Sequence, residues 1–161
     1  MTLPRTQLAR GAEDGTPESD YVAPAFRGEE ALGYCLRRAQ VSVFQKFTST
    51  FEDVQLRPVE FSILTLIHDN PGRKQTEISR ALGISRANFV PIIDGLQARD
   101  LVERRSSPED RRANPLHLTR AGVKFIQAVN KRHEALENEL TLRIGGAAKR
   151  AELLAILRLL A

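Results

Sequence analysis

The segment Ser85-Arg86-Ala87-Asn88 brings a hydroxyl, a guanidinium and a carboxamide together where a helix is expected to begin. A helix N-terminus offers unpaired N–H groups and the positive end of the helix dipole to a phosphate. Arginine can pair with O6 and N7 of guanine, and asparagine with N6 and N7 of adenine. In a helix-turn-helix, the leading residues of the second helix face base edges in the major groove. The sequence therefore predicts that Ser85, Arg86, Ala87 and Asn88 contact duplex DNA.

The residues around this segment predict the two helices that a helix-turn-helix needs. A first helix is expected over residues 76–82, and Gly83 supplies the left-handed residue that ends it. Ser85 caps a second helix over residues 86–100, whose inward side chains are expected to be Phe89, Ile92, Ile93 and Leu96. A helix, a glycine turn and a second helix with a polar leading edge form the motif.

Further helices are expected on either side of this motif. Helical periodicity begins at Gly28, and Pro58 lies where the first turn of another helix is expected. Thr119 is expected to cap a long helix that ends at Gly145-Gly146. The segment after these glycines is too apolar for a solitary surface helix.

Two short strands are expected between the second helix of the motif and Thr119. Residues 101–105 form the first, residues 106–110 a turn, and residues 116–118 alternate as a returning strand. Asn114 and Pro115 interrupt pairing, so the returning strand should be short.

The composition is that of a globular domain with an appended arm. The 161 residues are 42% hydrophobic and 27% charged, which supports a folded core without a disulfide or metal. Residues 1–26 lack periodicity and are expected to form a flexible arm before a single domain at residues 27–161. No apolar run is long enough to span a membrane, and the first residues do not resemble a signal peptide. With one cysteine, these features predict a cytoplasmic protein without a membrane partner.

Positive charge is concentrated downstream of the arm. Residues 1–30 carry three basic and six acidic residues, whereas residues 72–112 carry nine basic and six acidic residues. Residues 113–161 carry eight basic and four acidic residues, and the whole chain has a formal net charge of +4. This distribution favours a polyanionic partner, most simply nucleic acid.

Residues 55–125 resemble the MarR family of winged helix-turn-helix regulators. The most specific match is the run from Asp110 to Thr119, which is similar to the family's wing signature of Asp-x-Arg followed by an alternating strand ending in Leu-Thr. Residues 101–106 match the strand before it. Residues 76–78 and 82–86 match the helix-turn-helix.

The resemblance implies a mainly α fold with a small β wing. It places the winged helix-turn-helix at residues 57–119 and dimerisation helices at residues 28–50 and 120–161. It also implies a homodimer that binds a near-palindromic operator. The apolar side chains of Leu153, Leu157 and Leu160 are expected to contribute to the dimer interface. The alternative is that these apolar helices only cover their own core.

The resemblance also assigns residues to the DNA. Arg111 and Arg112 correspond to wing arginines that enter the minor groove, whose negative potential favours them. Asp110 is expected to orient a guanidinium by an ion pair. Thr76 is expected either to contact a phosphate or to cap its helix.

Two residues depart from the family pattern. Pro91 lies inside the second helix of the motif, where it removes the hydrogen bond to Ala87 and is expected to kink the helix or distort its first turns. Asp100 stands where many relatives have glycine at the helix end. We expect an altered sequence preference rather than a loss of DNA binding.

The resemblance further implies a small anionic aromatic effector. Phe44, Phe47, Phe51 and Phe61 are candidates to line an apolar cavity, although core packing is the better explanation for any single one of them. Residues 36–40 with residues 87–91 resemble a branch of the family linked to aromatic-acid breakdown, some of which senses an aromatic acyl-CoA. Arg37 and Arg38 would suit a carboxylate or the phosphates of CoA, and a solvated helix face is the alternative.

The first hypothesis is therefore a repressor that is released from DNA by a small aromatic acid or its CoA thioester. The alternative is a redox-responsive repressor that senses through Cys35. Peroxide-sensing relatives carry a reactive cysteine in the first helix, and Cys35 lies about two residues from that position by ungapped comparison, on another helix face. The neighbouring Arg37 and Arg38 would lower the pKa of a thiol. A packed cysteine is the alternative.

Catalysis and cofactors are not indicated. The sequence has no Gly-rich phosphate loop, no Gly-x-Ser-x-Gly and no metal motif, and its three histidines show no ligand spacing. We therefore predict no catalytic residue, no metal and no cofactor. A winged-helix module for protein or single-stranded nucleic acid is a further alternative, although two Tyr and no Trp offer few stacking surfaces.

Overall fold

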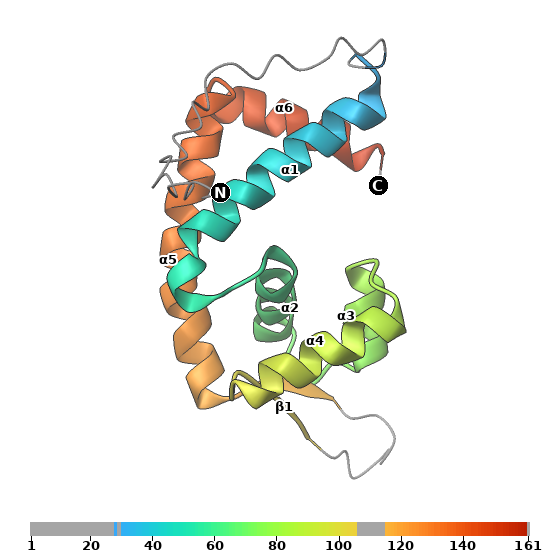
Figure 1. The fold of residues 1–161 in the computed structure, drawn as a ribbon, viewed down its shortest axis with the longest axis vertical. Helices are drawn as coiled ribbons and strands as arrows, with labels where there is room; N and C mark the ends of the chain where they lie inside the picture. The colour runs from blue at the N-terminus through green and yellow to red at the C-terminus, as the bar shows by residue number, and fades with distance from the viewer. Residues whose placement is uncertain (1–27, 29, 106–114, 161) are drawn as a thin grey trace, which may run out of the picture. The chain divides into compact units, whose positions relative to one another are not determined.

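The computed structural model describes residues 28, 30–105 and 115–160. The elements in chain order are α1 (Leu32–Thr50), the 3₁₀ helix η1 (Glu52–Val54), α2 (Pro58–Asp69), α3 (Gln75–Ala81), α4 (Arg86–Ala98), β1 (Val102–Arg104), β2 (Leu116–Leu118), α5 (Arg120–Arg143) and α6 (Ala147–Arg158) (Figure 1). The predicted mainly α fold with a small β wing is confirmed. No helix in the described ranges is long and apolar enough to cross a membrane.

The chain divides into two compact units, residues 1–37 and residues 38–161, and α1 begins in the first and ends in the second. The predicted arm at residues 1–26 lies outside the described residues.

Helical periodicity begins at Gly28 in the sequence, but α1 begins only at Leu32. The reason is a turn in which the N–H of Ala31 donates to the carbonyl of Gly28, so the α-helical pattern starts with Cys35 donating to Ala31.

The helix-turn-helix consists of α3 and α4, and its termini follow from local residue chemistry. Gly83 has a φ of 63°, which is the left-handed conformation expected of the residue that ends the first helix. The Ser85 hydroxyl accepts the N–H of Asn88 at 3.4 Å and caps α4, as predicted. On the inner face of α4, Phe89, Ile93 and Leu96 are buried.

Pro91 and Asp100 are both accommodated. The helix α4 continues from Arg86 through Pro91, its sixth residue, to Ala98, so the proline does not end it. Asp100 adopts a φ of 56°, the left-handed conformation that glycine adopts most readily. A single left-handed residue is tolerated by aspartate, whose short side chain can hydrogen-bond locally.

The wing contains a two-stranded antiparallel sheet in which Glu103 pairs with His117. The connection between α2 and α3 hydrogen-bonds to the same residue of β2: the N–H of Gly72 donates to the carbonyl of Leu116 at 2.9 Å, and the N–H of Leu116 donates to the carbonyl of Arg73 at 2.9 Å. The start of α3 is thereby fixed to the wing.

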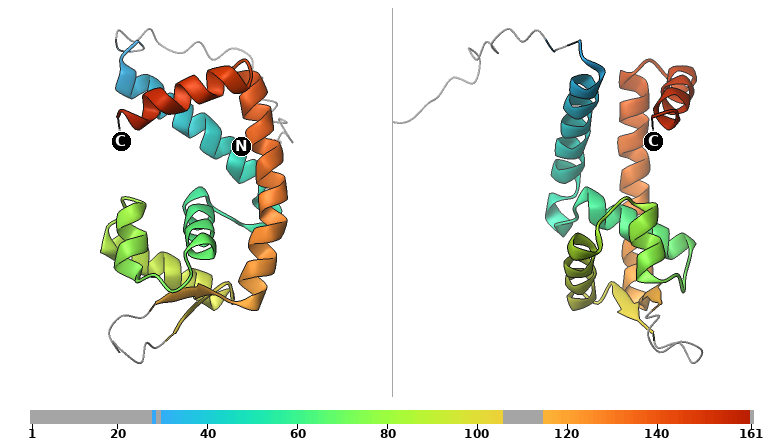
Figure 2. Two further views of the ribbon diagram at one scale, coloured as in Figure 1. Left: turned by 180° about the vertical axis from the view of Figure 1, so that it is seen from behind. Right: turned by 90° about the vertical axis from the view of Figure 1, so that its right-hand side faces the viewer.

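The long helix α5 runs from the wing at one end to α6 at the other (Figure 2). Thr119 caps it by accepting the N–H of Gly122 at 2.9 Å, as predicted. Gly122 is required here because a Cβ atom would lie 2.0 Å from the carbonyl oxygen of Leu101. Gly145 and Gly146 both have positive φ and separate α5 from α6, also as predicted.

Candidate nucleic-acid interface and effector site

The N-terminal end of α4 presents its polar residues to solvent. Ser85, Arg86, Ala87 and Asn88 are all exposed. Among the residues that the structure describes, no hydrogen bond or ion pair engages the side chain of Arg86 or the carboxamide of Asn88. Both side chains are therefore available to a ligand, beside a helix N-terminus that favours negative charge.

Thr76 does not cap α3. Lys74 precedes the helix as its N-cap residue, and its N–H donates to a carboxylate oxygen of Glu77 at 2.8 Å. This hydrogen bond, together with the charge of Arg73, lowers the pKa of the Glu77 carboxyl. Thr76 is the second residue of α3 and is exposed, which leaves its predicted phosphate contact as the remaining role.

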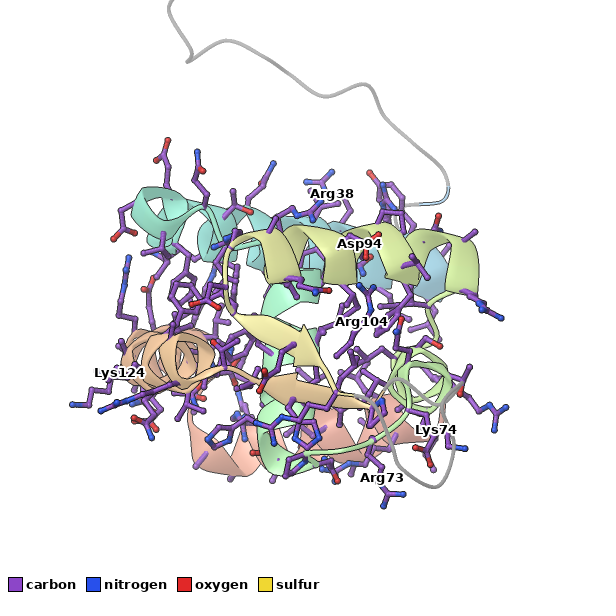
Figure 3. The ribbon with its side chains drawn as sticks, turned by 90° about the horizontal axis from the view of Figure 1, so that it is seen from below. Arg38, Arg73, Lys74, Asp94, Arg104 and Lys124 are labelled. Carbon is purple, nitrogen blue, oxygen red and sulfur yellow. The ribbon has the colours of Figure 1, made fainter. Side chains whose placement is uncertain are left out.

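The wing residues Asp110, Arg111 and Arg112 lie outside the described residues, so their predicted roles stay predictions. The strands that flank them are described. The N–H of Arg105 donates to the carbonyl of Pro115 at 3.0 Å, which closes the ladder on the side of the loop. Arg73 and Lys74 lie near one another at the start of α3 in the view from below (Figure 3).

An ion pair that sequence reasoning missed joins the wing to α4. Arg104 of β1 donates to a carboxylate oxygen of Asp94 at 2.6 Å and to the side-chain oxygen of Gln97 at 2.6 Å. Figure 3 shows Asp94 and Arg104 pointing toward one another. Asp94 and Gln97 are three residues apart and so share a face of the helix, which was the available signal. Their partner, ten residues beyond Asp94, could not be identified without the fold.

The wing also holds a partly buried histidine. His117 lies opposite Glu103, and its pKa is lowered because burial disfavours the charged ring and Arg105 adds a nearby positive charge. The imidazole is therefore neutral near pH 7.

Three of the four predicted effector phenylalanines come together. The ring centroid of Phe47 is 4.5 Å from that of Phe51 and 5.6 Å from that of Phe61. His133 of α5 joins them, with its ring 4.3 Å from Phe61. Phe44, also on α1, has a side chain that is 46% exposed. Its part in an effector site therefore stays a prediction.

The cluster is mostly packed core. Phe51 has no exposed surface and Phe47 only 5%, and the guanidinium of Arg132 covers the ring of Phe51 at 4.9 Å. A groove of about 520 Å³ begins at His133 and continues between α5 and α6. Its polar lining includes Arg150 and Glu137, which form an ion pair at 3.0 Å. Neither Arg150 nor Glu137 was singled out by sequence reasoning.

The remaining predicted residues lie on α1. Arg37 and Arg38 are exposed, as is Cys35. Consecutive helical residues point about 100° apart, so the two arginines cannot share one direction. Within the described part of the chain, no group of three His, Cys, Asp or Glu residues could hold a metal ion.

Comparison with known proteins decides the family. A sequence model of the MarR family matches residues 54–113. The transcriptional repressor CouR, solved in complex with a 23-mer DNA duplex, is 42% identical, and the match covers 86% of this chain and 99% of that chain with a TM-score of 0.80. The chain belongs to the MarR family. As a member of that family, it is a transcriptional regulator.

Two further matches are a ligand-bound repressor structure and a regulatory protein assigned to an operon. CouR bound to p-coumaroyl-CoA is 41% identical, covering 83% of this chain and 94% of that chain with a TM-score of 0.75. A proposed transcriptional regulatory protein for the hcr operon of Thauera aromatica is 29% identical over 89% of this chain and 88% of its own length.

Proposed function

We propose that this MarR-family regulator is a repressor that binds a near-palindromic operator as a homodimer and is released by a small aromatic effector. The observation that carries the proposal is the exposed N-terminal end of α4, where the side chains of Arg86 and Asn88 have no polar partner among the described residues. The similarity to CouR, which was solved on a DNA duplex, supports the same conclusion.

Each DNA contact has a distinct role in this proposal. Arg86 and Asn88 read base edges in the major groove, while Ser85 and Ala87 bring the helix end close to the phosphates. Thr76 contacts a phosphate from α3. Arg111 and Arg112 of the wing enter the minor groove, with Asp110 orienting one guanidinium.

A homodimer explains the apolar surface of the single chain. Large apolar side chains are exposed on α1, around the end of α5, on α6 and just after α6, and exposed apolar surface of this kind marks an association site. They are Leu32, Leu36, Val41, Val43, Phe44, Leu142, Ile144, Leu153, Ile156, Leu159 and Leu160. A two-fold dimer would bury them and would set two α4 helices about one duplex turn apart.

The proposed effector is an aromatic acid or its CoA thioester. The complex of CouR with p-coumaroyl-CoA supports this chemistry. In this chain Phe61 and His133 form the less buried side of the aromatic cluster and offer an aromatic ring a stacking surface. Arg37 and Arg38 are the proposed partners of the carboxylate or of the CoA phosphates.

Release requires that the effector bind one arrangement of the dimer more tightly than the other, because a ligand with equal affinity for both shifts nothing. Repression itself needs only occupancy of the operator. Oxidation sensing through Cys35 stays a prediction: the thiol is exposed, and exposure by itself is no evidence of reactivity.

Fluorescence anisotropy on duplex DNA from upstream of this protein's own gene tests the proposal. The complex is formed at physiological salt, and p-coumarate or p-coumaroyl-CoA is then added in parallel. Release by either compound supports an aromatic effector, and release by the thioester alone supports the phosphate role of Arg37 and Arg38. Failure to bind any upstream duplex with salt-dependent affinity would contradict the repressor proposal.

A further inference from the structure

Arg99, at the C-terminal end of α4, is bound to a distant part of the chain. One guanidinium nitrogen donates to the carbonyl of Val54 at 3.1 Å, and another lies 3.5 Å from both the carbonyl of Gln55 and the carboxylate of Glu60. We call these contacts with Val54, Gln55 and Glu60 the Arg99 clamp. The planar guanidinium can reach three acceptors at once because its donors are fixed in a fork.

The acceptors of the Arg99 clamp are rigidly held. The side chain of Glu60 is only 7% exposed, and its carboxylate also accepts the N–H of Arg57 at 3.0 Å and the guanidinium of Arg57 at 2.7 Å. Gln55 has a φ of 48°, so the backbone turns sharply where its carbonyl meets Arg99. Removing one cationic partner from a buried carboxylate costs free energy, and this cost opposes the separation of Arg99 from Glu60.

The segment that Arg99 grips is residues 51–57, which joins α1 to α2. A second arginine holds this segment from α5: Arg132 donates to both carboxylate oxygens of Asp53, at 2.8 and 3.0 Å, and to the carbonyl of Thr50. This pairing lowers the pKa of Asp53 and raises that of Arg132. Residues 51–57 thus continue directly from the last residue of α1 and are held by arginines from both α4 and α5.

Arg99 is remote from the predicted base contacts. It lies eleven residues beyond Asn88 in the sequence, which corresponds to about 16 Å along a helix at 1.5 Å per residue. Figure 1 shows this end of α4 on the side of α5, away from α3. The guanidinium also lies 5.8 Å from the centroid of Phe125 of α5. Its contacts thus suit positioning of the helix rather than contact with DNA.

We infer that Arg99 is a positioning residue that couples the DNA-reading helix α4 to the connection between α1 and α2. The inference rests on the proposed function, because it assigns a route between the dimerisation helix and the DNA. Coupling between two sites is reciprocal. If a change at residues 51–57 alters DNA affinity, DNA bound at the N-terminal end of α4 must alter the stability of residues 51–57 by the same free energy, and we expect it to stabilise them.

Amide hydrogen exchange on the full chain tests this inference without an effector. Exchange of residues 51–57 is measured with and without the upstream duplex in the wild type, in Arg99→Ala and in Arg57→Ala. Arg57→Ala is the matched control, with exchange compared over residues 51–56: it removes another partner of Glu60, at the N-cap of α2, and among the described residues no hydrogen bond or ion pair joins Arg57 to α4. We expect DNA to slow exchange about 5-fold or more in the wild type and in Arg57→Ala, and less than about 2-fold in Arg99→Ala.

The outcomes separate the inference from the proposed function. No duplex binding by the wild type removes the proposed function and this inference with it. Wild-type binding without protection of residues 51–57, or equal protection in Arg99→Ala, overturns the inference alone. If Arg99→Ala does not fold, Arg99→Lys decides: it keeps a charge beside Glu60 but not the fork, so retained protection counts against the clamp and lost protection supports it.

Discussion

Arg86 and Arg99 stand at opposite ends of α4 and are used in different ways. The Arg86 side chain is exposed and has no hydrogen bond or ion pair with the described residues, whereas the Arg99 side chain meets two carbonyls and a buried carboxylate. Arg104, at 24% exposure, likewise pairs with α4 through Asp94. Arginine content alone therefore does not identify a DNA-binding surface. An arginine without a partner is available to phosphates and bases, while a paired one fixes the helix that carries them.

The largest change in the free energy of unfolding should come from the core residue that lies between the two ends of α4. Phe89 is 1% exposed on the inner face of α4, so Phe89→Ala should lower the free energy of unfolding by about 3–5 kcal/mol through lost burial and the cavity that remains. Urea denaturation measures this. Since both ends of α4 depend on this packing, a smaller change than about 1 kcal/mol would mean that α4 is held mainly by its arginine contacts.

Arg86→Ala should separate the two ends most clearly. Loss of a bidentate base contact should weaken binding to the operator by about 1–3 kcal/mol, while the unfolding free energy should stay within about 0.5 kcal/mol of wild type. Anisotropy titration and urea denaturation measure the two quantities. A stability loss in Arg86→Ala would contradict its unpaired state.

Asn88→Ala and Arg112→Ala should differ in what they lose. Asn88→Ala should relax preference at one base pair, by about 1–3 kcal/mol of discrimination. Arg112→Ala should weaken all duplexes about equally and reduce the salt slope by about 1. Titrations of single-substitution duplexes at several salt concentrations distinguish the two patterns. The reverse pattern would exchange the roles assigned to α4 and the wing.

Arg104→Ala should have a modest effect on stability. Its ion pair with Asp94 is partly solvent-exposed, so we expect a loss of about 0.5–1 kcal/mol in unfolding free energy. The double-mutant cycle with Asp94→Ala measures the pair itself. A coupling energy near zero would show that the contact does not fix the wing to α4.

The smallest effect should come from pH. The pKa of His117 is lowered in the folded chain, so the unfolded chain takes up a proton first, near pH 6.5. The stability contributed by the neutral ring is therefore present above pH 6.5 and is lost as the pH falls through the folded-state pKa. Urea midpoints between pH 7.5 and pH 5.5 should decline less in His117→Gln, and an equal decline would assign the effect to other groups.

Local chemistry accounts for the parts of the fold that were predicted. Ser85 and Thr119 cap helices, Gly83 ends one and Pro58 begins one, and each acts on backbone groups within a few residues. The exposure of the N-terminal end of α4 follows from the same signals. The predicted start of α1 at Gly28 was wrong because periodicity does not show where a turn precedes a helix.

The sequence by itself determined the order of helices and strands, the helix-turn-helix and the polar, exposed start of α4, since these depend on short-range hydrogen bonding and on the period of apolar residues. Only the tertiary structure decided which arginines are paired. Arg99 meets acceptors 44 and 45 residues away, and Arg132 meets Asp53 at a separation of 79 residues. It also decided that Phe44 is exposed while Phe47 and Phe51 are buried. Such contacts depend on how packed elements meet in space, and no pattern along the chain specifies that.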